Sequence, residues 1–370
     1  MALMQYKRIV IKVGSALVAP EGQGCSGKYL LAIAGFINTC LQRNIEVILV
    51  SSGSVAAGRN HVSHGSGQPS IAAKQAMAAV GQMQMIANWQ RFFDCACSQL
   101  LITHGDLKDR RRYLNIKNTL RVLLENNVIP IINENDTVAT QELKVGDNDN
   151  LAALVAMVAE ADALLILSDV DGVFDADPRQ VYDAKLIPEI PNITKEIYQL
   201  AGGTNNPLAT GGMSTKIQAA DKACEQGIDT YIVNGTQAKV FLTLLKGKNP
   251  GTRFTAKGTN LTAKKRWLKT TLKSEGTLLV DQGAVNALQR KGASLLPIGI
   301  RAIKGEFSKG AAITVAYIDD PKESLIAKGI CQYSSRDLAR IQGISSQKIE
   351  TVLGYCPSQE VIHRDDLVLL

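Results

Sequence analysis

The feature that most constrains the fold of this 370-residue chain is an alternation of short β-branched runs with helical patterns, which extends from the N-terminus to about residue 236. Strands that alternate with helices build βαβ units, so the pattern predicts a largely parallel sheet. Ligands of such sheets bind beyond the carboxyl ends of the strands. We expect the strands at Arg8–Val13, Glu46–Ser51, Gln99–Thr103, Val128–Ile132, Ala163–Ser168 and Thr230–Val233.

Apolar residues at helical spacing fill the intervals between these strands. In the first interval, Leu30, Ile33, Ala34 and Ile37 follow an i, i+3, i+4, i+7 pattern, and Ser26 precedes them as a candidate N-cap. Aromatic residues make up only 5% of the chain, which also favours aliphatic helices packed on a sheet. The same spacing predicts further helices at Gln75–Phe93, Asp109–Asn126, Asn150–Ala159 and Ser214–Gln226.

The composition changes after Arg253. Seven basic residues and no acidic ones lie between Arg253 and Lys273, and they equal the whole formal net charge of +7. We interpret this basic strip as a solvated linker, with contact to phosphate or to an acidic surface as the alternative. From Gly276 onward, short alternating runs separated by glycine predict a small β-rich domain. Its strands are expected at Thr277–Val280, Ile300–Ile303 and Ala312–Tyr317.

Several classes of protein are excluded at this stage. The longest apolar stretches, Leu151–Ala159 and Ala161–Leu167, fall far short of the roughly 20 residues that a bilayer requires. The N-terminal residues show neither the apolar core nor the cleavage site of a signal peptide. The seven cysteines are scattered, with no C-x-x-C pair and no histidine at zinc-ligand spacing. We therefore expect a cytoplasmic protein with reduced cysteines, no membrane segment and no protein-bound metal.

Residues 22–27 match the pattern G-x-G-x-x-G between a strand and a helix, as a dinucleotide-binding fingerprint should. However, these glycines begin eight residues after Gly14 instead of in the strand-to-helix turn, and Glu46 falls at the start of the second strand instead of its end. We interpret the segment as a loop. The P-loop pattern is also missing, because the residue directly before Lys216 is a threonine where that pattern requires glycine.

Lys12 is the more informative residue, because it interrupts a strand whose central position should be buried on both faces. A buried ammonium without a partner would be costly. Either the side chain reaches past the end of the strand, or an anion lies there beside the backbone amides of Gly14 and Ser15. We favour the anion site. Residues 50–58 repeat this design after the second strand, either as a plain tight turn or with small residues that let backbone N–H groups approach a ligand.

Four polar clusters follow other strands or precede helices. Asn133–Asp136 and Gly146–Asn150 are rich in Asx residues, which are ordinary turn and N-cap formers but could also pair with the ammonium of an amino acid or hold a lysine in position. Ser168 and Asp169 close another strand. Thr210–Lys216 supplies glycine amides, hydroxyls and a second lysine at the start of a helix, which suits a nucleotide phosphate.

The four histidines lie outside all of these clusters, which argues against histidine acid–base or triad chemistry. Two lysines with glycine-rich turns and few bases suit phosphoryl transfer, where catalysis consists mostly of positioning and charge stabilisation. A carboxylate nucleophile, with a pKa of roughly 4, would arrive ionised and need no base.

The ordered motifs at residues 11–15, 52–58, 132–136, 144–151, 168–169 and 210–216 resemble the amino acid kinase family. Ile-Asn-Glu-Asn-Asp combined with Gly-Asp-Asn-Asp-Asn is the most specific part, and it resembles the branch that phosphorylates glutamate. Residues 276–281, 292–297 and 307–310 resemble the PUA module that bacterial members of this branch carry, and the chain also ends as they do, at residues 363–366.

The resemblance implies an α/β fold, a three-layer αβα sandwich with a mainly parallel central sheet. It places an amino acid kinase domain at residues 1–255, the basic linker at 256–275, the PUA domain at 276–355 and a tail at 356–370. It further implies that ATP, with Mg²⁺ as cofactor, phosphorylates the γ-carboxylate of L-glutamate to give L-glutamyl 5-phosphate, the first step of proline biosynthesis. Feedback inhibition by proline, a homo-oligomer (dimer or tetramer) and transfer of the product to the next enzyme are also implied.

The resemblance assigns roles to individual residues as well. Lys12 and Lys216 would stabilise the transferring phosphoryl group, and Asp149 would hold the lysines in orientation. Glutamate would be bound by Ser52, Asp136 and Asn148. ATP would be bound by Lys12, Gly14, Ser168, Asp169, Thr210, Gly211, Gly212, Met213, Ser214, Thr215 and Lys216.

Two other functions compete with this interpretation. The first is another amino acid kinase that acts on acetylglutamate or aspartate, but the former normally lacks a PUA tail and the latter carries a different regulatory domain. The second is RNA binding, because PUA modules elsewhere bind RNA and the basic strip adjoins this one. RNA binding as the main role would leave both lysine sites unexplained, so we expect the tail to act in regulation or assembly.

Overall fold

The computed structural model describes residues 5–63, 67–138, 148–200, 212–258, 274–320 and 324–370. The chain forms two compact units, one made of Met1–Lys108 with Ile116–Asn260 and the other of Asp109–Asn115 with Leu261–Leu370. Each unit has its own sheet. Most of the basic strip, and with it most of the predicted linker, lies outside the described residues.

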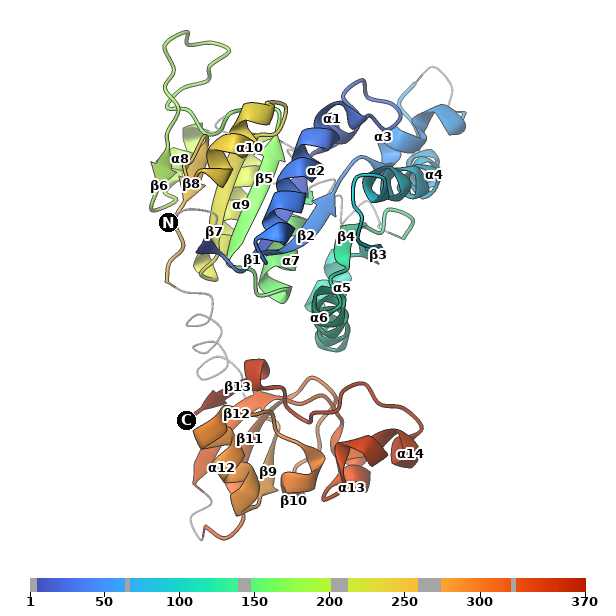
Figure 1. Ribbon diagram of the computed structural model, residues 1–370, viewed down its shortest axis with the longest axis vertical. Helices are drawn as coiled ribbons and strands as arrows, with labels where there is room; N and C mark the ends of the chain where they lie inside the picture. The colour runs from blue at the N-terminus through green and yellow to red at the C-terminus, as the bar shows by residue number, and fades with distance from the viewer. Residues whose placement is uncertain (1–4, 64–66, 139–147, 201–211, 259–273, 321–323) are drawn as a thin grey trace. The chain divides into compact units, whose positions relative to one another are not determined.

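The first unit is built on an eight-stranded sheet with the order β3-β4-β2-β1-β5-β7-β8-β6 (Figure 1). The pairings from β3 to β7 are all parallel, which confirms the predicted sheet, and β8 pairs antiparallel with β7. The strands are β1 (Arg8–Val13), β2 (Glu46–Ser51), β3 (Cys97–Ile102), β4 (Ile129–Glu134), β5 (Ala163–Ser168), β6 (Glu189–Ile190), β7 (Asp229–Asn234) and β8 (Thr252–Phe254).

Helices cover both faces of this sheet, as the αβα prediction requires. In Figure 1, α2 and α10 lie on one face, and α7 and α9 lie on the other. The predicted N-cap is confirmed, because the Ser26 side chain accepts a hydrogen bond from the Lys28 N–H. The helices are α1 (Ser15–Val18), α2 (Gly27–Gln42), α3 (Ser54–Gly58), α4 (Ile71–Gln90), α5 (His104–Lys108), α6 (Arg110–Glu125), α7 (Asn148–Val158), α8 (Lys195–Leu200), α9 (Met213–Glu225) and α10 (Ala238–Leu245), with a 3₁₀ turn at Arg59–His61.

The second unit contains a five-stranded sheet with the order β10-β9-β11-β12-β13. Its three predicted strands are present, and their apolar faces form one core with the helices of the unit. The strands are β9 (Gly276–Val280), β10 (Ile300–Lys304), β11 (Ala312–Tyr317), β12 (Leu325–Ile330) and β13 (Leu367–Leu369). The helices are α12 (Gln282–Lys291), α13 (Ser335–Ile341) and α14 (Ile349–Leu353), with 3₁₀ turns at Pro297–Gly299, Ser346–Lys348 and Arg364–Asp366.

Two features of the first unit determine where a ligand can bind. The strands β4, β2, β1 and β5 are consecutive neighbours in the sheet, so the residues that follow their carboxyl ends converge at one edge. Beside that edge, α3 and α4 cross with their backbones in contact. A Cβ atom at Gly58 would lie 1.9 Å from the Met77 carbonyl oxygen, and one at Gly81 would lie 1.9 Å from the Ser54 carbonyl oxygen. The crossing therefore requires glycine at both positions.

Candidate active site

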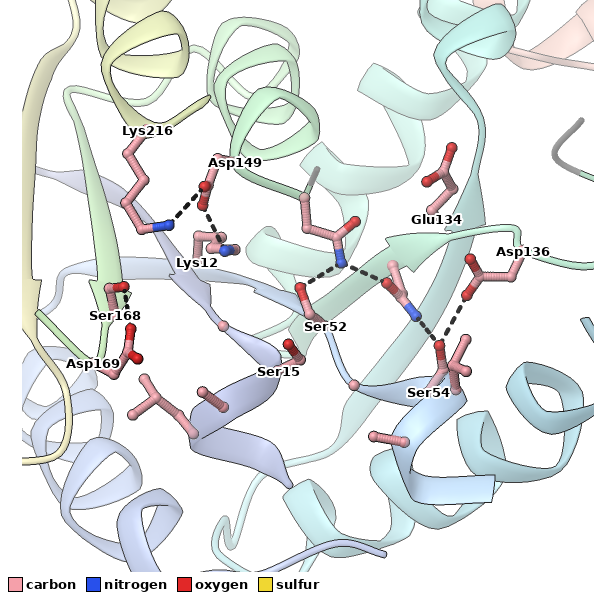
Figure 2. A pocket seen from close by; sticks show the side chains of 18 of the residues that line it. Lys12, Ser15, Ser52, Ser54, Glu134, Asp136, Asp149, Ser168, Asp169 and Lys216 are labelled. Carbon is pink, nitrogen blue, oxygen red and sulfur yellow. Dashed lines mark hydrogen bonds and ion pairs between the residues drawn. The ribbon is translucent and has the colours of Figure 1, made fainter. Parts of the chain in front are cut away.

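A pocket of about 360 Å³ opens at this edge of the sheet (Figure 2). Residues from α7 and α9 complete its wall beside the strand ends. The predicted site residues that line it are Lys12, Gly14, Ser52, Asp136, Asn148, Asp149, Ser168, Asp169 and Lys216. The structure thus brings together residues from one end of the first unit's sequence to the other.

The centre of the pocket is a buried charge cluster. The Lys12 ammonium lies 2.5 Å from one carboxylate oxygen of Asp149, and the Lys216 ammonium lies 3.1 Å from the other. The side chains of Lys12, Lys216 and Asp149 are 8%, 7% and 1% exposed. The puzzle of a lysine within a buried strand is resolved, because the partner of Lys12 is a carboxylate from the first turn of α7.

This cluster carries an excess of positive charge. Burial alone would raise the pKa of Asp149, but the two ammonium groups outweigh burial and hold the pKa of Asp149 below its usual range. Asp149 is therefore ionised at neutral pH. Two cations and one anion leave one net positive charge in a poorly hydrated place, which is where an anionic group would be strongly attracted.

One side of the cluster holds the residues predicted to bind a nucleotide. At the end of β5, the Ser168 hydroxyl donates to the Asp169 carboxylate at 3.1 Å. Thr215, which precedes Lys216 on α9, donates to the Gly212 carbonyl at 2.8 Å. The remaining predicted residues of this segment do not all reach the pocket: Gly212, Met213, Ser214 and Thr215 are not among the residues that line it, and Thr210 and Gly211 lie outside the described residues.

The other side of the cluster is a wall of amides and hydroxyls. The Asn148 amide nitrogen donates to the Ser52 hydroxyl at 2.7 Å and to the Asn133 side-chain oxygen at 2.9 Å. The Asn133 amide nitrogen donates to the Ser54 hydroxyl at 3.2 Å, and Ser54 donates to the Asp136 carboxylate at 2.8 Å. Burial raises the pKa of Asp136, and the hydrogen bond from Ser54 opposes that rise only in part. The three predicted glutamate-binding residues thus lie on one wall.

Several residues that line the pocket had no role assigned from the sequence, and Ser54, Asn133, Glu134 and Arg59 are among them. Ser54, Asn133 and Glu134 belong to motifs that the sequence singled out, but only the fold shows that their side chains line the site. Arg59 also lines it, from the turn after α3. No pattern in the sequence predicts that Arg59 lines the pocket, because its place depends on the direction in which α3 and the turn after it run from the end of β2.

The described residues contain neither a metal-binding cluster nor a helix that could span a membrane. Among them, no group of three histidine, cysteine, aspartate or glutamate side chains is placed to hold a metal ion. The most buried carboxylate of the pocket, Asp149, already contacts two lysines. Within the same ranges, none of the helices combines the length and apolar character needed to cross a membrane.

The fold and the site define a class: an α/β protein in which two lysines share one buried carboxylate at the carboxyl edge of a mainly parallel sheet. Residues 7–234 match the profile of the "Amino acid kinase family", and residues 276–353 match that of the "PUA domain". The chain belongs to the amino acid kinase family.

Curated relatives match over the full length of the chain. A protein of Idiomarina loihiensis named "Glutamate 5-kinase" is 52% identical over 365 residues, which cover 99% of this chain and 98% of that protein. A protein of Salinibacter ruber with the same name is 50% identical and covers 100% of this chain and 98% of its own length. Among solved structures, a UMP kinase from Bacillus anthracis aligns with a TM-score of 0.48 at 18% identity, covering 68% of this chain and 97% of that one.

Proposed function

We propose that this protein transfers the γ-phosphoryl group of ATP to the side-chain carboxylate of L-glutamate and forms L-glutamyl 5-phosphate, the first step of proline biosynthesis. The observation that carries the proposal is the buried Lys12–Asp149–Lys216 cluster, which lies between two chemically different sides of one pocket. Full-length relatives named glutamate 5-kinase support the choice of glutamate as substrate.

The arrangement across the pocket matches the order of the reacting groups. Figure 2 shows Ser168, Asp169 and Lys216 toward one side, Ser54 and Asp136 toward the other, and Lys12 with Asp149 between them. ATP on the first side and the amino acid on the second would place the γ-phosphoryl group beside both lysines. Positioning of this kind supplies much of the rate enhancement in phosphoryl transfer.

The two lysines act on the charge that the reaction moves. Negative charge spreads over the oxygens of the transferring phosphoryl group, and ammonium groups fixed in a buried site stabilise it without needing to reorient. Asp149 keeps the lysines in place, because each of its oxygens contacts one ammonium. The attacking carboxylate is ionised at neutral pH, so no base is needed, and none of the described histidines lines the pocket.

The amide and hydroxyl wall would recognise the amino acid. An α-ammonium group pairs with the Asp136 carboxylate, which accepts from Ser54 as well. Ser52 lies nearer to Lys12 than Asp136 does in Figure 2, and together with Asn148, which donates a hydrogen bond to it, it would orient the side-chain carboxylate. Asp136 thus selects a zwitterion, while the lysines select the acid that is phosphorylated.

Magnesium fits this site as a companion of the nucleotide. Mg²⁺ usually keeps several waters and binds through substrate phosphates and one or two carboxylates, so it does not require the enclosed cluster that the described residues lack. Asp169 is the pocket carboxylate on the nucleotide side and would be the residue to contact it. When bound, the ion neutralises phosphate charge that the two lysines do not reach.

A hydroxamate assay tests the proposal. Hydroxylamine traps an acyl phosphate, so the purified protein is incubated with ATP, Mg²⁺ and hydroxylamine together with L-glutamate, L-aspartate, N-acetyl-L-glutamate or UMP in separate reactions. We expect ATP-dependent hydroxamate with L-glutamate. UMP is the negative control, because a phosphoanhydride gives no hydroxamate. Product from aspartate or N-acetylglutamate in place of glutamate would contradict the proposal, and added proline tests the inhibition that the family resemblance implies.

A further inference from the structure

Gln82 lies directly behind the amide and hydroxyl wall without lining the pocket. It follows Gly81 on α4, at the point where α4 and α3 touch through their backbones. The close crossing brings the Gln82 side chain to Asn133, and the residue is only 5% exposed. Its side-chain oxygen accepts a hydrogen bond from the Asn133 amide nitrogen at 2.9 Å.

The Asn133 amide is the junction of the wall. Its oxygen accepts from Asn148, and its nitrogen donates one hydrogen to Ser54 and the other to Gln82. One end of this series of hydrogen bonds is the Asp136 carboxylate, which accepts from Ser54, and at the other end the Asn148 nitrogen donates to Ser52 and lies 3.5 Å from the Ser51 carbonyl oxygen. The donor and the acceptor of each of these hydrogen bonds are therefore fixed, and Gln82 supplies the acceptor for the second hydrogen of the Asn133 amide.

Packing alone does not account for an amide at this position. The Gln82 side-chain nitrogen is buried and has no hydrogen-bond partner among the described residues. A buried donor left without a partner lowers stability, so an apolar side chain of similar length would avoid that loss. What the amide contributes, and an apolar side chain lacks, is the oxygen that faces Asn133.

We propose that Gln82 is a positioning residue of the amino acid site, which fixes the plane of the Asn133 amide and through it the orientation of Asn148, Ser54 and Asp136. This inference rests on the proposed function, because it takes the wall to be the glutamate subsite. Without the Gln82 oxygen, one hydrogen of the Asn133 amide has no acceptor in a buried site, and the bonds to Asn148 and Ser54 alone hold the amide less firmly. Binding of the amino acid weakens, while the lysine cluster that handles the phosphoryl group stays unchanged.

The test is a steady-state comparison of Gln82→Met with the wild-type chain in the hydroxamate assay. Methionine keeps the length of the side chain and removes its oxygen. We expect KM for glutamate to rise about tenfold, which is the effect of losing about 1.4 kcal/mol of binding. KM for ATP and kcat should stay within about threefold, and the melting temperature should change little, because the substitution removes one unpaired donor and creates another.

Three further variants make the test specific. Gln84 lies on the same helix, but its amide is hydrogen-bonded to the His61 ring and not to Asn133. Gln84→Met should therefore leave KM for glutamate unchanged. Gln82→Glu keeps an oxygen toward Asn133, so its KM for glutamate should stay near that of the wild-type chain. If Gln82→Met does not fold, the KM of Gln82→Glu is the measurement that tests the inference. In an Asn133→Ala background, Gln82→Met should have no further effect, since Gln82 acts through Asn133.

Each outcome decides for or against the inference. An unchanged KM for glutamate in Gln82→Met, an equal rise for glutamate and ATP, or a Gln82→Glu variant as impaired as Gln82→Met would overturn it. Failure of the wild-type chain to form glutamyl hydroxamate would instead refute the proposed function, so the two failures are distinguishable.

Discussion

The charge cluster at the centre of the pocket and the amide and hydroxyl wall beside it bury polar groups in different ways. Lys12, Asp149 and Lys216 are full charges in contact with one another, with a net positive charge left over. The wall from Asn148 to Asp136 consists mainly of neutral amides and hydroxyls linked by hydrogen bonds. A charge cluster interacts strongly with the negative charge that moves during phosphoryl transfer. A network of neutral hydrogen bonds instead distinguishes one amino acid from another by the positions of its donors and acceptors. We therefore expect the charge cluster to govern turnover and the amide and hydroxyl wall to govern selection of the amino acid.

Removal of one lysine should have the largest effect and tests whether the charge cluster governs turnover. Lys12→Ala and Lys216→Ala should each lower kcat by about 10²–10³, the scale of losing one positioned donor that stabilises the transition state. Circular dichroism should show a folded protein. Lys222→Ala is the matched control, because Lys222 lies on the same helix as Lys216 and bonds Asn150 outside the pocket lining. Near-normal turnover in either lysine variant would remove that lysine from the mechanism.

Replacing the anion of the cluster tests whether Asp149 positions the lysines. Asp149→Asn keeps the shape but leaves two buried ammonium groups without a counter-charge. We expect kcat to fall about 10- to 100-fold and stability to drop by about 3–5 kcal/mol, as for a buried ion pair that loses one partner. Urea unfolding measures the second effect. A variant of wild-type stability and turnover would show that the lysines are held by other groups.

A substitution on the opposite wall should act on affinity instead of turnover. Asp136→Asn removes the charge that pairs with the α-ammonium group but keeps an acceptor for Ser54. KM for glutamate should rise about tenfold or more, consistent with a loss of about 1.5–3 kcal/mol for a charged hydrogen bond. KM for ATP should change by less than about threefold. An equal loss for both substrates would contradict the assignment of Asp136 to the amino acid.

The smallest expected effect is a pH dependence confined to that wall. Burial raises the pKa of Asp136, so this carboxylate takes up a proton at a higher pH than an exposed aspartate does. The protonated acid cannot pair with an ammonium, and KM for glutamate should therefore rise as the pH falls through the raised pKa. KM measured from neutral to mildly acidic pH checks this. The Asp136→Asn variant should lack the dependence, and if it retains the same profile another group is responsible.

The sequence predicted the central strands well because their signal is local. β1, β2 and β5 begin and end at the predicted residues, since short aliphatic runs bounded by glycine or polar residues are visible without any tertiary contact. β6 and β8, with two and three residues, have no such run. They form strands because the edge of the sheet pairs with them, which is information that the local sequence does not contain.

By itself, the sequence determined that a lysine interrupts a buried strand and that small or polar residues follow several others, and these facts favoured an anionic partner for the lysine over a side chain that reaches past the strand end. Resemblance to the amino acid kinase family then pointed to Asp149. Only the tertiary structure decided which groups meet. Strand order is set by long-range pairing, and placing β4, β2, β1 and β5 side by side brought both lysines to one carboxylate. The crossing of α3 and α4 likewise brought Gln82 to Asn133, because a contact between distant segments depends on packing and leaves no periodic mark in the chain.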